Sequence, residues 1–402
     1  MEGSEALKMY VLPFPSPGHT IPLINLAQIL ALKGHHITIL TTPSNAQVLP
    51  NNLNVHTFDF PSDQVGLPSG LENAASAGDS VTAHKILKAA LLLKPQIETL
   101  VQQNPPHVLI SDFMFRWSSK LGVPTLLFTP MPIFVDCLFL HTKHNNTHGI
   151  IVNSFEELED GYTQCYQKLT GVKVWHVGMT SLMLNFTKKR ACTSQKDQIS
   201  EECLNWLNSK EPNSQQLEIA HGVEASGHEF LWVFPKNMHV EVEEWLPHGF
   251  EERTKENNRG MVVRGWVHQE LILKHVAIGG FLTQCGWNSV TEGISAGVPL
   301  ITMPRFAEQF LNEKLVTEVH KIGVEVGECE WSISSYDAGS KVVGWELIKN
   351  AVERVMKDEG GSLRKRAKDM QEKAHKAIQK GGSSYNNLTA LVQSLKQKNI
   401  HG

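Results

Sequence analysis

The stretch from Trp266 to Gln309 holds most of the residues whose types and spacing could do chemistry. Residues 276–283 are a short apolar run with β-branched side chains, which predicts a buried parallel strand. Residues 284–286 (QCG) then turn the chain, and Gly286 removes side-chain bulk where the backbone must approach another group closely. A strand followed by a glycine turn and a helix is half of a nucleotide-binding unit.

A helix is predicted directly after this turn. Asn288 or Ser289 can cap it, it runs to about Ala296, and Gly297 followed by Pro299 ends it. The N–H groups and the positive dipole end at its start would suit a phosphate. The residues alone allow two interpretations, an anion site at a helix N-terminus or an ordinary joint between a strand and a helix.

Two further polar residues follow predicted strands. His19 comes after the apolar run Met9–Phe14, and Asp112 directly follows the run 107–111. Open α/β sheets bind ligands at the carboxyl ends of their strands, and a histidine can exchange a proton near neutral pH. A carboxylate beside the ring would fix its tautomer and stabilise the imidazolium. Alternatively, His19 is a surface residue and Asp112 caps a helix.

The stretch 266–309 resembles, along its whole length, the signature box of plant UDP-dependent glycosyltransferases. The matching positions are Trp266, Gln269, Cys285-Gly286-Trp287-Asn288-Ser289, Glu292, Gly297-Val298-Pro299 and Glu308-Gln309. Residues 13–23 (PFPSPGHTIPL) resemble the N-terminal motif of the same family, which implies that His19 is the catalytic base and that Asp112 is its hydrogen-bonding partner. So many matched positions are not expected by chance.

The resemblance implies a UDP-sugar site with defined roles. Trp266 would stack on uracil, and Gln269 would bind the base or the ribose. Glu292 lies one helical turn beyond Asn288 and would accept from the ribose hydroxyls, while Ser289 would hold the diphosphate. The other residues implied at this site are Val267, Gln284 and Gly286 and, near the sugar hydroxyls, Trp287, Asn288, Glu308 and Gln309.

Two residues depart from the family pattern. Gln284 stands where the family usually has a histidine that contacts the diphosphate, and glutamine cannot carry a positive charge. His268 stands where the family usually has a proline, a change that we expect to alter only a loop.

Two segments of the family pattern are missing. The family has a sizeable segment between the positions of Phe139 and Asn145, which this chain passes in a few residues. It also has a strand and a glycine-serine turn, reading roughly VVYVCFGS, where residues 212–214 run directly into a predicted helix at Gln215. That strand would be the central one of the second sheet, so its loss would leave unpaired strand edges and a void.

Composition excludes several classes of protein. A net charge of −4 without a basic patch gives no reason to expect a nucleic-acid partner. No apolar run is long enough to span a membrane, and the N-terminus MEGSEALK is not a secretory signal. The six cysteines have neither metal-site nor disulfide-framework spacing, which favours a cytoplasmic protein with reduced thiols.

The alternation of strands and helices predicts an α/β fold with doubly wound sheets. The expected divisions are an acceptor-binding domain at 1–180, a polar linker at 181–200 and a UDP-sugar-binding domain at 201–402. The resemblance implies a GT-B-like fold, in which two Rossmann-like domains face a cleft and the last helix (385–397) packs back on the first domain. We expect a monomer.

The expected function is inverting transfer of a sugar from a UDP-sugar to a hydroxyl of a small plant metabolite. Gln309 favours UDP-glucose as the co-substrate, with galactose and glucuronate donors left open, and no cofactor or metal is expected. The expected acceptor is a triterpenoid or flavonoid aglycone. The alternatives are a non-catalytic or impaired remnant of such an enzyme, because of the missing segments and Gln284, or another enzyme of this fold such as a sugar-nucleotide epimerase.

Overall fold

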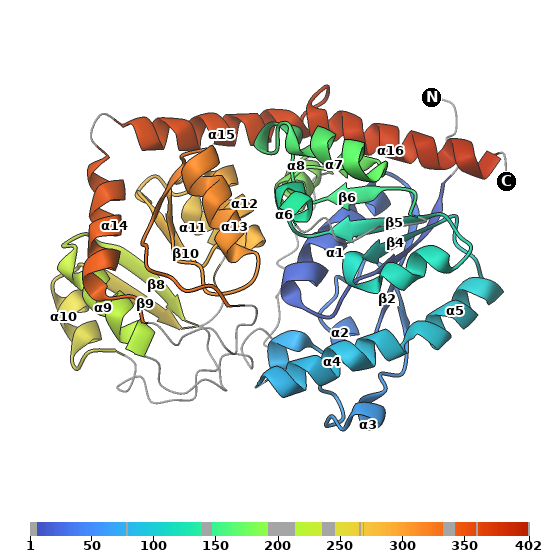
Figure 1. Cartoon of the computed structure of the whole chain (residues 1–402), viewed down its shortest axis with the longest axis horizontal. Helices are drawn as coiled ribbons and strands as arrows, with labels where there is room; N and C mark the ends of the chain where they lie inside the picture. Colours follow the sequence, from blue (N-terminus) through green and yellow to red (C-terminus); the bar gives the residue numbers. More distant parts are fainter. Residues whose placement is uncertain are drawn as a thin grey trace. The chain divides into compact units, whose positions relative to one another are not determined.

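The computed structural model describes residues 6–77, 79–138, 147–191, 214–234, 246–264, 267, 269–332, 342–358 and 361–400. The chain divides into two compact units (Figure 1). Unit 1 comprises Met1–Ala74, His84–Gln198 and Lys373–Gly402, and unit 2 comprises Ala75–Ala83 and Ile199–Glu372. None of the helices in the described ranges is both long and apolar enough to cross a membrane.

Unit 1 is built on a seven-stranded parallel sheet with the order β3-β2-β1-β4-β5-β6-β7. Its strands are β1 (Lys8–Leu12), β2 (His36–Thr41), β3 (Asn54–Thr57), β4 (Val108–Asp112), β5 (Thr125–Thr129), β6 (Ile150–Val152) and β7 (Val174–His176). The helices connected to them are α1 (Pro17–Leu32), α2 (Pro43–Ala46), α3 (Ser62–Val65), α4 (Ser80–Leu92), α5 (Lys94–Gln103), α6 (Ile133–Leu138), α7 (Tyr162–Thr170), α8 (Thr180–Ala191) and α16 (Ser383–Ile400).

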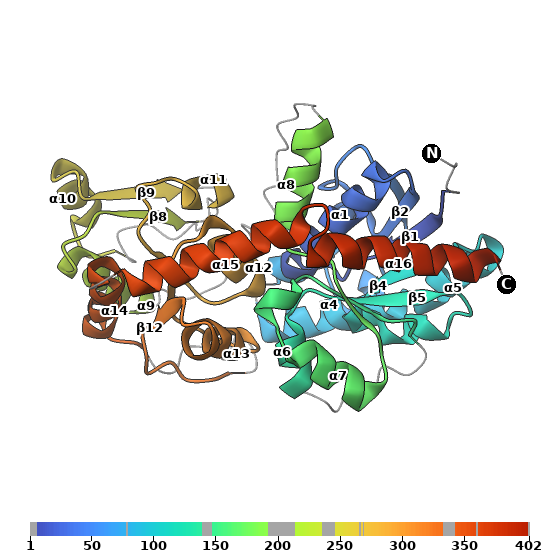
Figure 2. The same cartoon turned by 90° about the horizontal axis from the view of Figure 1, so that it is seen from above.

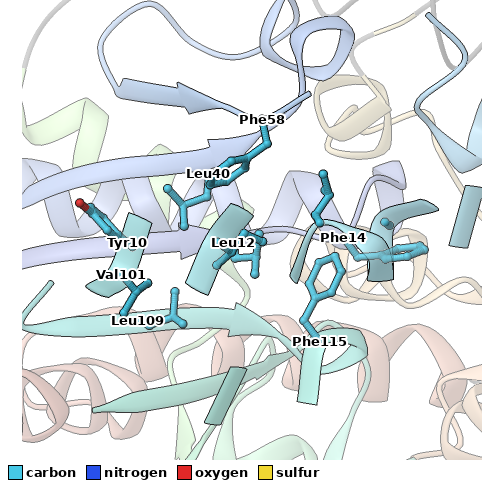
Figure 3. Packing of buried hydrophobic residues seen from close by; sticks show 11 residues of the cluster. Tyr10, Leu12, Phe14, Leu40, Phe58, Val101, Leu109 and Phe115 are labelled. Carbon is cyan, nitrogen blue, oxygen red and sulfur yellow. The ribbon is translucent and has the colours of Figure 1, made fainter. Parts of the chain in front are cut away.

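The core of unit 1 lies on both sides of β1. Tyr10 and Leu12 of β1 project to one face of the sheet, because alternate residues of a strand point the same way. There they meet Leu109 of β4 and Val101 of α5 (Figure 3). The cluster continues to Phe14, three residues before α1, and His19 lies in the first turn of that helix.

The first part of the segment predicted as a linker, residues 181–191, is helical. Leu182, Met183 and Leu184 of α8 are buried, and α8 packs against α1. Three consecutive buried residues lie on more than one face of a helix, so the sequence shows no helical period here. This part of the predicted polar linker is therefore a helix packed on unit 1, and residues 192–200 lie outside the described ranges.

The C-terminal helix α16 packs on β7 within unit 1. Asn387 donates to Glu156 Oε1 at 2.8 Å, and Ser383 donates to Glu157 Oε2 at 2.8 Å. The ammonium of Lys33, the residue after α1, lies 5.5 Å from the centre of the Tyr385 ring. The chain enters unit 1 again at Lys373, within α15, which Figure 2 shows leading toward α16.

Unit 2 contains two separate parallel sheets, β8-β9 and β10-β11-β12. Its strands are β8 (Phe230–Phe234), β9 (Gly260–Arg264), β10 (Phe281–Thr283), β11 (Leu300–Thr302) and β12 (Gly323–Glu325). Its helices are α9 (Ser214–Ala225), α10 (Phe250–Glu256), α11 (Gln269–Leu273), α12 (Trp287–Ala296), α13 (Gln309–Lys314), α14 (Trp345–Lys357) and the first part of α15 (Ser362–Ile378).

The sheet of unit 2 is divided where that of unit 1 is continuous. Unit 1 has the single sheet β3-β2-β1-β4-β5-β6-β7, whereas unit 2 has the separate sheets β8-β9 and β10-β11-β12, with no described strand that pairs with both. The side chains of this region are less buried than those of unit 1, with Leu231 of β8 41% exposed and Met261 of β9 60% exposed. Among the described residues, each of the two sheets thus has edges without a neighbouring strand, which agrees with the expected loss of a central strand.

The strand before the 284–286 turn is shorter than predicted. Only Phe281–Thr283 pairs as β10, whereas residues 276–280 form a turn and an irregular segment. Val276 is almost fully exposed, so its β-branched side chain does not contribute to a buried strand.

Candidate active site

His19 and Asp112 lie side by side in unit 1. Strands β1 and β4 are neighbours in register, with Leu12 opposite Ser111, so the segments that leave their carboxyl ends start from the same edge of the sheet. His19 Nδ1 lies 2.9 Å from Asp112 Oδ2, as a donor to the carboxylate when the ring is neutral. The predicted pairing of these two residues is therefore present.

Asp112 holds two groups with its two oxygens. Oδ2 faces His19, while Oδ1 accepts from the backbone N–H of Met114 at 2.9 Å and so caps the short helix that follows β4. The two sequence interpretations of Asp112, partner of a histidine and helix cap, are thus both correct. Asp112 is fully buried and held on both sides, whereas 23% of the His19 side chain is exposed.

Two aromatic rings fix the orientation of His19, and sequence reasoning did not single them out. Phe113 stacks on the imidazole with 5.6 Å between ring centres and an interplanar angle of 17°. Phe14 meets it edge-on at 5.3 Å. Phe113 follows Asp112 directly and Phe14 ends the apolar run before His19, but nothing in the sequence distinguishes a phenylalanine that stacks on a histidine from one that only fills the core.

The start of α12 in unit 2 differs from the prediction by two or three residues. The helix begins at Trp287 with Gly286 as its N-cap, so Asn288 and Ser289 lie inside the first turn and neither caps it. Gly286 has no side chain, so the N-cap residue supplies no side-chain hydrogen bond to the first N–H groups of the helix. The predicted end is confirmed, since Ala296 is the last helical residue and Gly297 is left-handed with φ of 68°.

Gly286 faces open space. A β-carbon built on it would meet no atom within 4 Å, and its φ of −58° is accessible to any residue. The glycine is therefore required neither by its backbone conformation nor by a neighbour among the described residues. This fits a place where the backbone must approach a ligand closely.

The turn before Gly286 is held in an unusual conformation. Cys285 has a φ of 62°, which residues with a β-carbon rarely adopt. Its N–H donates to Thr283 Oγ1 at 3.2 Å, and its carbonyl accepts from the Asn312 side chain at 2.9 Å. Asn312 was not predicted as a site residue, since its role depends on contact between α13 and the turn.

The two residues assigned to the ribose lie together. Gln269, the first residue of α11, donates to Glu292 Oε2 at 2.8 Å. Burial raises the pKa of the Glu292 carboxyl, and the hydrogen bond from Gln269 opposes this effect. A carboxylate that is partly desolvated and oriented by an amide would be a strong acceptor for hydroxyl groups.

Several of the residues assigned to the sugar have structural contacts within the protein. Gln309 is buried, and its side-chain oxygen accepts from the backbone N–H groups of Arg305 and Phe306 at 2.9 and 3.2 Å. It thus shapes the loop after β11, and Glu308 is the N-cap residue of α13. Trp287 is only 4% exposed, so it would offer a ligand mainly its backbone.

The other predicted donor residues can be placed only in part. Asn288 and Ser289 are half-buried in the first turn of α12, and Val267 is half-buried just before α11. Gln284 is exposed directly after β10. Trp266 and His268 lie outside the described residues, and the ligand roles of all these residues stay predictions.

Restoring a cation at position 284 is expected to strengthen UDP binding. Gln284→His should gain on the order of 1 kcal/mol, because a charge-assisted hydrogen bond to a phosphate is about twice as strong as a neutral one. Titration calorimetry with UDP should show a larger gain at pH 6 than at pH 8, since the added imidazole is protonated at the lower pH. Gln284→Asn is the matched control, and equal affinity of all three proteins would contradict the phosphate role of this position.

Unit 1 also buries a titratable group away from His19. Glu159 accepts from the backbone N–H of Phe134 at 2.8 Å, at the start of α6. Its other oxygen lies 3.8 Å from Nδ1 of His176, whose Nε2 lies 2.6 Å from Thr163 Oγ1. Burial raises the pKa of Glu159 to about 8 and lowers the pKa of His176 to about 4, so both groups are mainly neutral at pH 7.

This network should make unit 1 less stable as the pH rises from 6.5 to 8. The folded state keeps the Glu159 proton up to pH 8 while the unfolded chain has released it, so stability falls by up to about 1.4 kcal/mol per pH unit. Below pH 6.5 His176 acts in the opposite sense, because only the unfolded chain binds its proton there. Thermal melts of Glu159→Gln should lose this slope, and those of the exposed control Glu157→Gln should keep it. The same slope in Glu159→Gln would rule Glu159 out as its cause.

The described residues contain no group of three or more His, Cys, Asp or Glu side chains placed to hold a metal ion.

Comparison with known proteins adds independent findings. The family model for UDP-glucuronosyl and UDP-glucosyl transferases matches residues 203–360. UDP-glucosyl transferase 73CC6 of Saponaria officinalis is 39% identical over 97% of this chain and 97% of its own length. UDP-glucose flavonoid 3-O-glucosyltransferase 7 of Fragaria ananassa is 36% identical over 97% of this chain and 96% of its own length.

A solved structure confirms the fold class. Glycyrrhiza uralensis UGT73P12, complexed with glycyrrhetinic acid 3-O-monoglucuronide, superimposes with a TM-score of 0.82 and 32% identity, covering 99% of this chain and 97% of that one. The alignment with the Saponaria relative spans 473 positions, more than the 402 residues of this chain, so the relative has residues that this chain lacks.

Proposed function

The chain belongs to the family of UDP-glucuronosyl and UDP-glucosyl transferases, and from this premise we propose that it transfers glucose from UDP-glucose, with inversion, to a hydroxyl of a small plant metabolite. The observation that carries the proposal is the 2.9 Å contact between His19 and the buried Asp112, because it supplies an oriented base for the acceptor hydroxyl.

In the proposed reaction, His19 takes the proton of the acceptor hydroxyl. With Nδ1 donating to Asp112, the neutral ring has its lone pair on Nε2, which is the atom that binds the proton. The hydroxyl oxygen then forms a bond to the anomeric carbon while the bond from that carbon to the UDP oxygen breaks. Asp112 stabilises the imidazolium that results but does not itself take the proton.

The proposed place of the leaving UDP is the start of α12. The first N–H groups of the helix and its dipole would stabilise the charge that develops on the diphosphate, and Ser289 could donate a further hydrogen bond. The open space at Gly286 lets the phosphates approach this backbone closely. Gln269 and Glu292, already bonded to each other, would receive the ribose.

A flavonoid or triterpenoid aglycone is the proposed acceptor. The Fragaria relative is named for flavonoids, and the Glycyrrhiza structure holds glycyrrhetinic acid 3-O-monoglucuronide. In this chain the exposed part of His19 is flanked by the rings of Phe14 and Phe113, which favour an apolar acceptor. The same proposal includes a monomer in the cytoplasm that uses the UDP-sugar as co-substrate without a cofactor or metal.

The divided sheet of unit 2 favours a second candidate, an impaired member of the family. The proposed UDP site lies at the end of β10, whose outer edge has no strand beside it in the described part of the chain. An incompletely paired strand would hold the turn at 284–286 less rigidly, which would weaken donor binding more than it would affect His19.

Incubation of the purified protein with UDP-glucose and a panel of flavonoid and triterpenoid aglycones tests both candidates. Mass spectrometry should detect products heavier by one hexose, and parallel reactions with UDP-galactose and UDP-glucuronate test the donor. Glycosides formed only with another donor would overturn the glucose assignment. An absence of product together with failure to bind UDP would support the impaired form.

A further inference from the structure

A group of polar residues lies at the carboxyl end of β2 in unit 1 and joins α2 to a later loop. Glu72 of this loop makes two of the contacts. Its Oε2 accepts from the backbone N–H of Ser44 at 2.9 Å, and its carbonyl accepts from the side chain of Asn45 at 3.2 Å. The hydroxyl of Ser44 donates in addition to the carbonyl of Gly70 at 3.2 Å. Residues 70–72 are thus bonded to the start of α2 at several points.

Asn45 is the buried centre of this group. It is 6% exposed, and Glu72 is 7% exposed. The Asn45 amide donates also to Thr42 Oγ1 at 2.8 Å, and its oxygen accepts from the side chain of Asn73 at 2.7 Å. A buried carboxylate and a buried amide are costly unless their hydrogen bonds are made. The bonds therefore favour one position of Glu72 and Asn73 over all others.

The loop bonded in this way reaches the turn that precedes His19. The backbone N–H of Ala74 donates to the carbonyl of Pro15 at 2.8 Å. The Ala74 side chain packs against the hydrophobic cluster that includes Phe14, which Figure 3 shows. Phe14 is the ring that meets His19 edge-on at 5.3 Å. Two contacts of Ala74 thus connect the loop to the residues on which the orientation of His19 depends.

The turn between β1 and α1 has few donors of its own, because two of its four residues (PFPS) are prolines, which have no N–H group. Its carbonyls take hydrogen bonds from outside the turn. The carbonyl of Phe14 accepts from Thr20 Oγ1 at 2.8 Å, and the carbonyl of Pro15 accepts from Ala74. If Ala74 moved away, the turn would lose a bond that its own residues do not replace, and the first turn of α1, which carries His19, would be held less firmly.

We propose that Glu72 is a positioning residue for the transfer reaction. By fixing residues 70–74 against the turn, it keeps Phe14 and the first turn of α1 where His19 meets Asp112. Asp112 orients the imidazole through Nδ1, whereas Glu72 fixes the backbone from which the imidazole projects. Glu72 acts through His19 and takes no proton itself. The inference rests on the proposed function, in which His19 is the base.

Three single variants of the full chain test this role. Glu72→Ala should lower kcat roughly ten- to hundredfold, the usual effect of a small misplacement of a catalytic group, without changing the affinity for UDP in calorimetry. Glu72→Gln should restore most of the rate, because its amide oxygen can still accept from Ser44. Gln167→Ala is the matched control, since the Gln167 oxygen also accepts from one backbone N–H, that of Val174 at 3.0 Å, in the edge strand β7. It should leave kcat within about twofold.

A double variant and hydrogen exchange separate positioning from a general loss of stability. If Glu72 acts through His19, adding Glu72→Ala to His19→Ala should lower the residual kcat by no more than about twofold. Amide exchange should be faster over residues 14–20 in Glu72→Ala than in the natural chain, and unchanged there in Gln167→Ala. Ser44→Ala, which removes only the bond to Gly70, replaces Glu72→Ala if the latter does not fold, and it should produce the same changes to a smaller extent.

Three results would overturn the proposal. The first is a normal kcat of Glu72→Ala when His19→Ala is slow, and the second is a full additional loss of kcat in the double variant. The third is unchanged exchange over residues 14–20, which decides the matter even if the chain has no measurable turnover. A His19→Ala variant as fast as the natural chain would instead contradict the proposed function, and with it the role of Glu72.

Discussion

The variant His19→Ala is expected to lower kcat by about two to four orders of magnitude, the usual contribution of a general base. The reason is that the acceptor hydroxyl is a poor nucleophile until its proton is taken. His19 is hydrogen-bonded to the buried Asp112, which orients the ring as a general base requires. UDP affinity should be unchanged, because the proposed UDP residues belong to unit 2. Initial rates with a reactive aglycone, together with calorimetry of UDP binding, measure the two quantities separately.

Variants of Asp112 separate its two hydrogen bonds. Asp112→Asn keeps an oxygen that can accept from Met114 but removes the negative charge beside the ring, so it should reduce kcat less than His19→Ala while leaving the melting temperature nearly unchanged. Asp112→Ala should lower both, since loss of a cap costs about 1 kcal/mol. Unchanged turnover in His19→Ala would remove this residue from the mechanism.

The parts of the fold that sequence could predict are those set by local patterns. The end of α12 is one example, because glycine followed by proline stops a helix whatever surrounds it. The pairing of His19 with Asp112 is another, although the residues alone left a surface histidine and a capping aspartate open and the resemblance of the N-terminal motif implied the pair. The structure shows its basis, since β1 and β4 are neighbours and the segments that follow them start from one edge of the sheet.

The parts that could not be predicted depend on contacts between distant segments. The side chain of Asn312 in α13 donates a hydrogen bond to the carbonyl of Cys285 in the turn, and no property of either residue in the sequence predicts this bond. Gln309 was assigned to the sugar, but its side-chain oxygen binds the loop backbone at Arg305 and Phe306. The helical form of residues 181–191 arises from packing against α1, which overrides a sequence without helical period.

Inserting the sequence VVYVCFGS between Ser214 and Gln215 is expected to raise the melting temperature of unit 2. A strand between β8 and β10 would pair with the N–H groups of Leu231, Val233 and Leu282, each worth about 1 kcal/mol. A gain of about 3 kcal/mol should raise the melting temperature of unit 2 by roughly 6–12 °C, given a shift of about 2–4 °C per kcal/mol for a domain of this size.

The same insertion should also raise the affinity of the protein for UDP. The glycine-serine turn after the inserted strand would add backbone N–H groups at the carboxyl edge of the sheet, where α12 begins, and anions bind such groups well. An insertion of eight glycine and serine residues is the control for chain length, and it should change neither quantity, while Gln284→His should raise affinity without changing the melting temperature. Melts of the four proteins with and without UDP test this. If the natural chain already melts cooperatively at an ordinary mesophile temperature and binds UDP tightly, unit 2 is stable and functional with its two separate sheets. This result would contradict the prediction that a strand is missing.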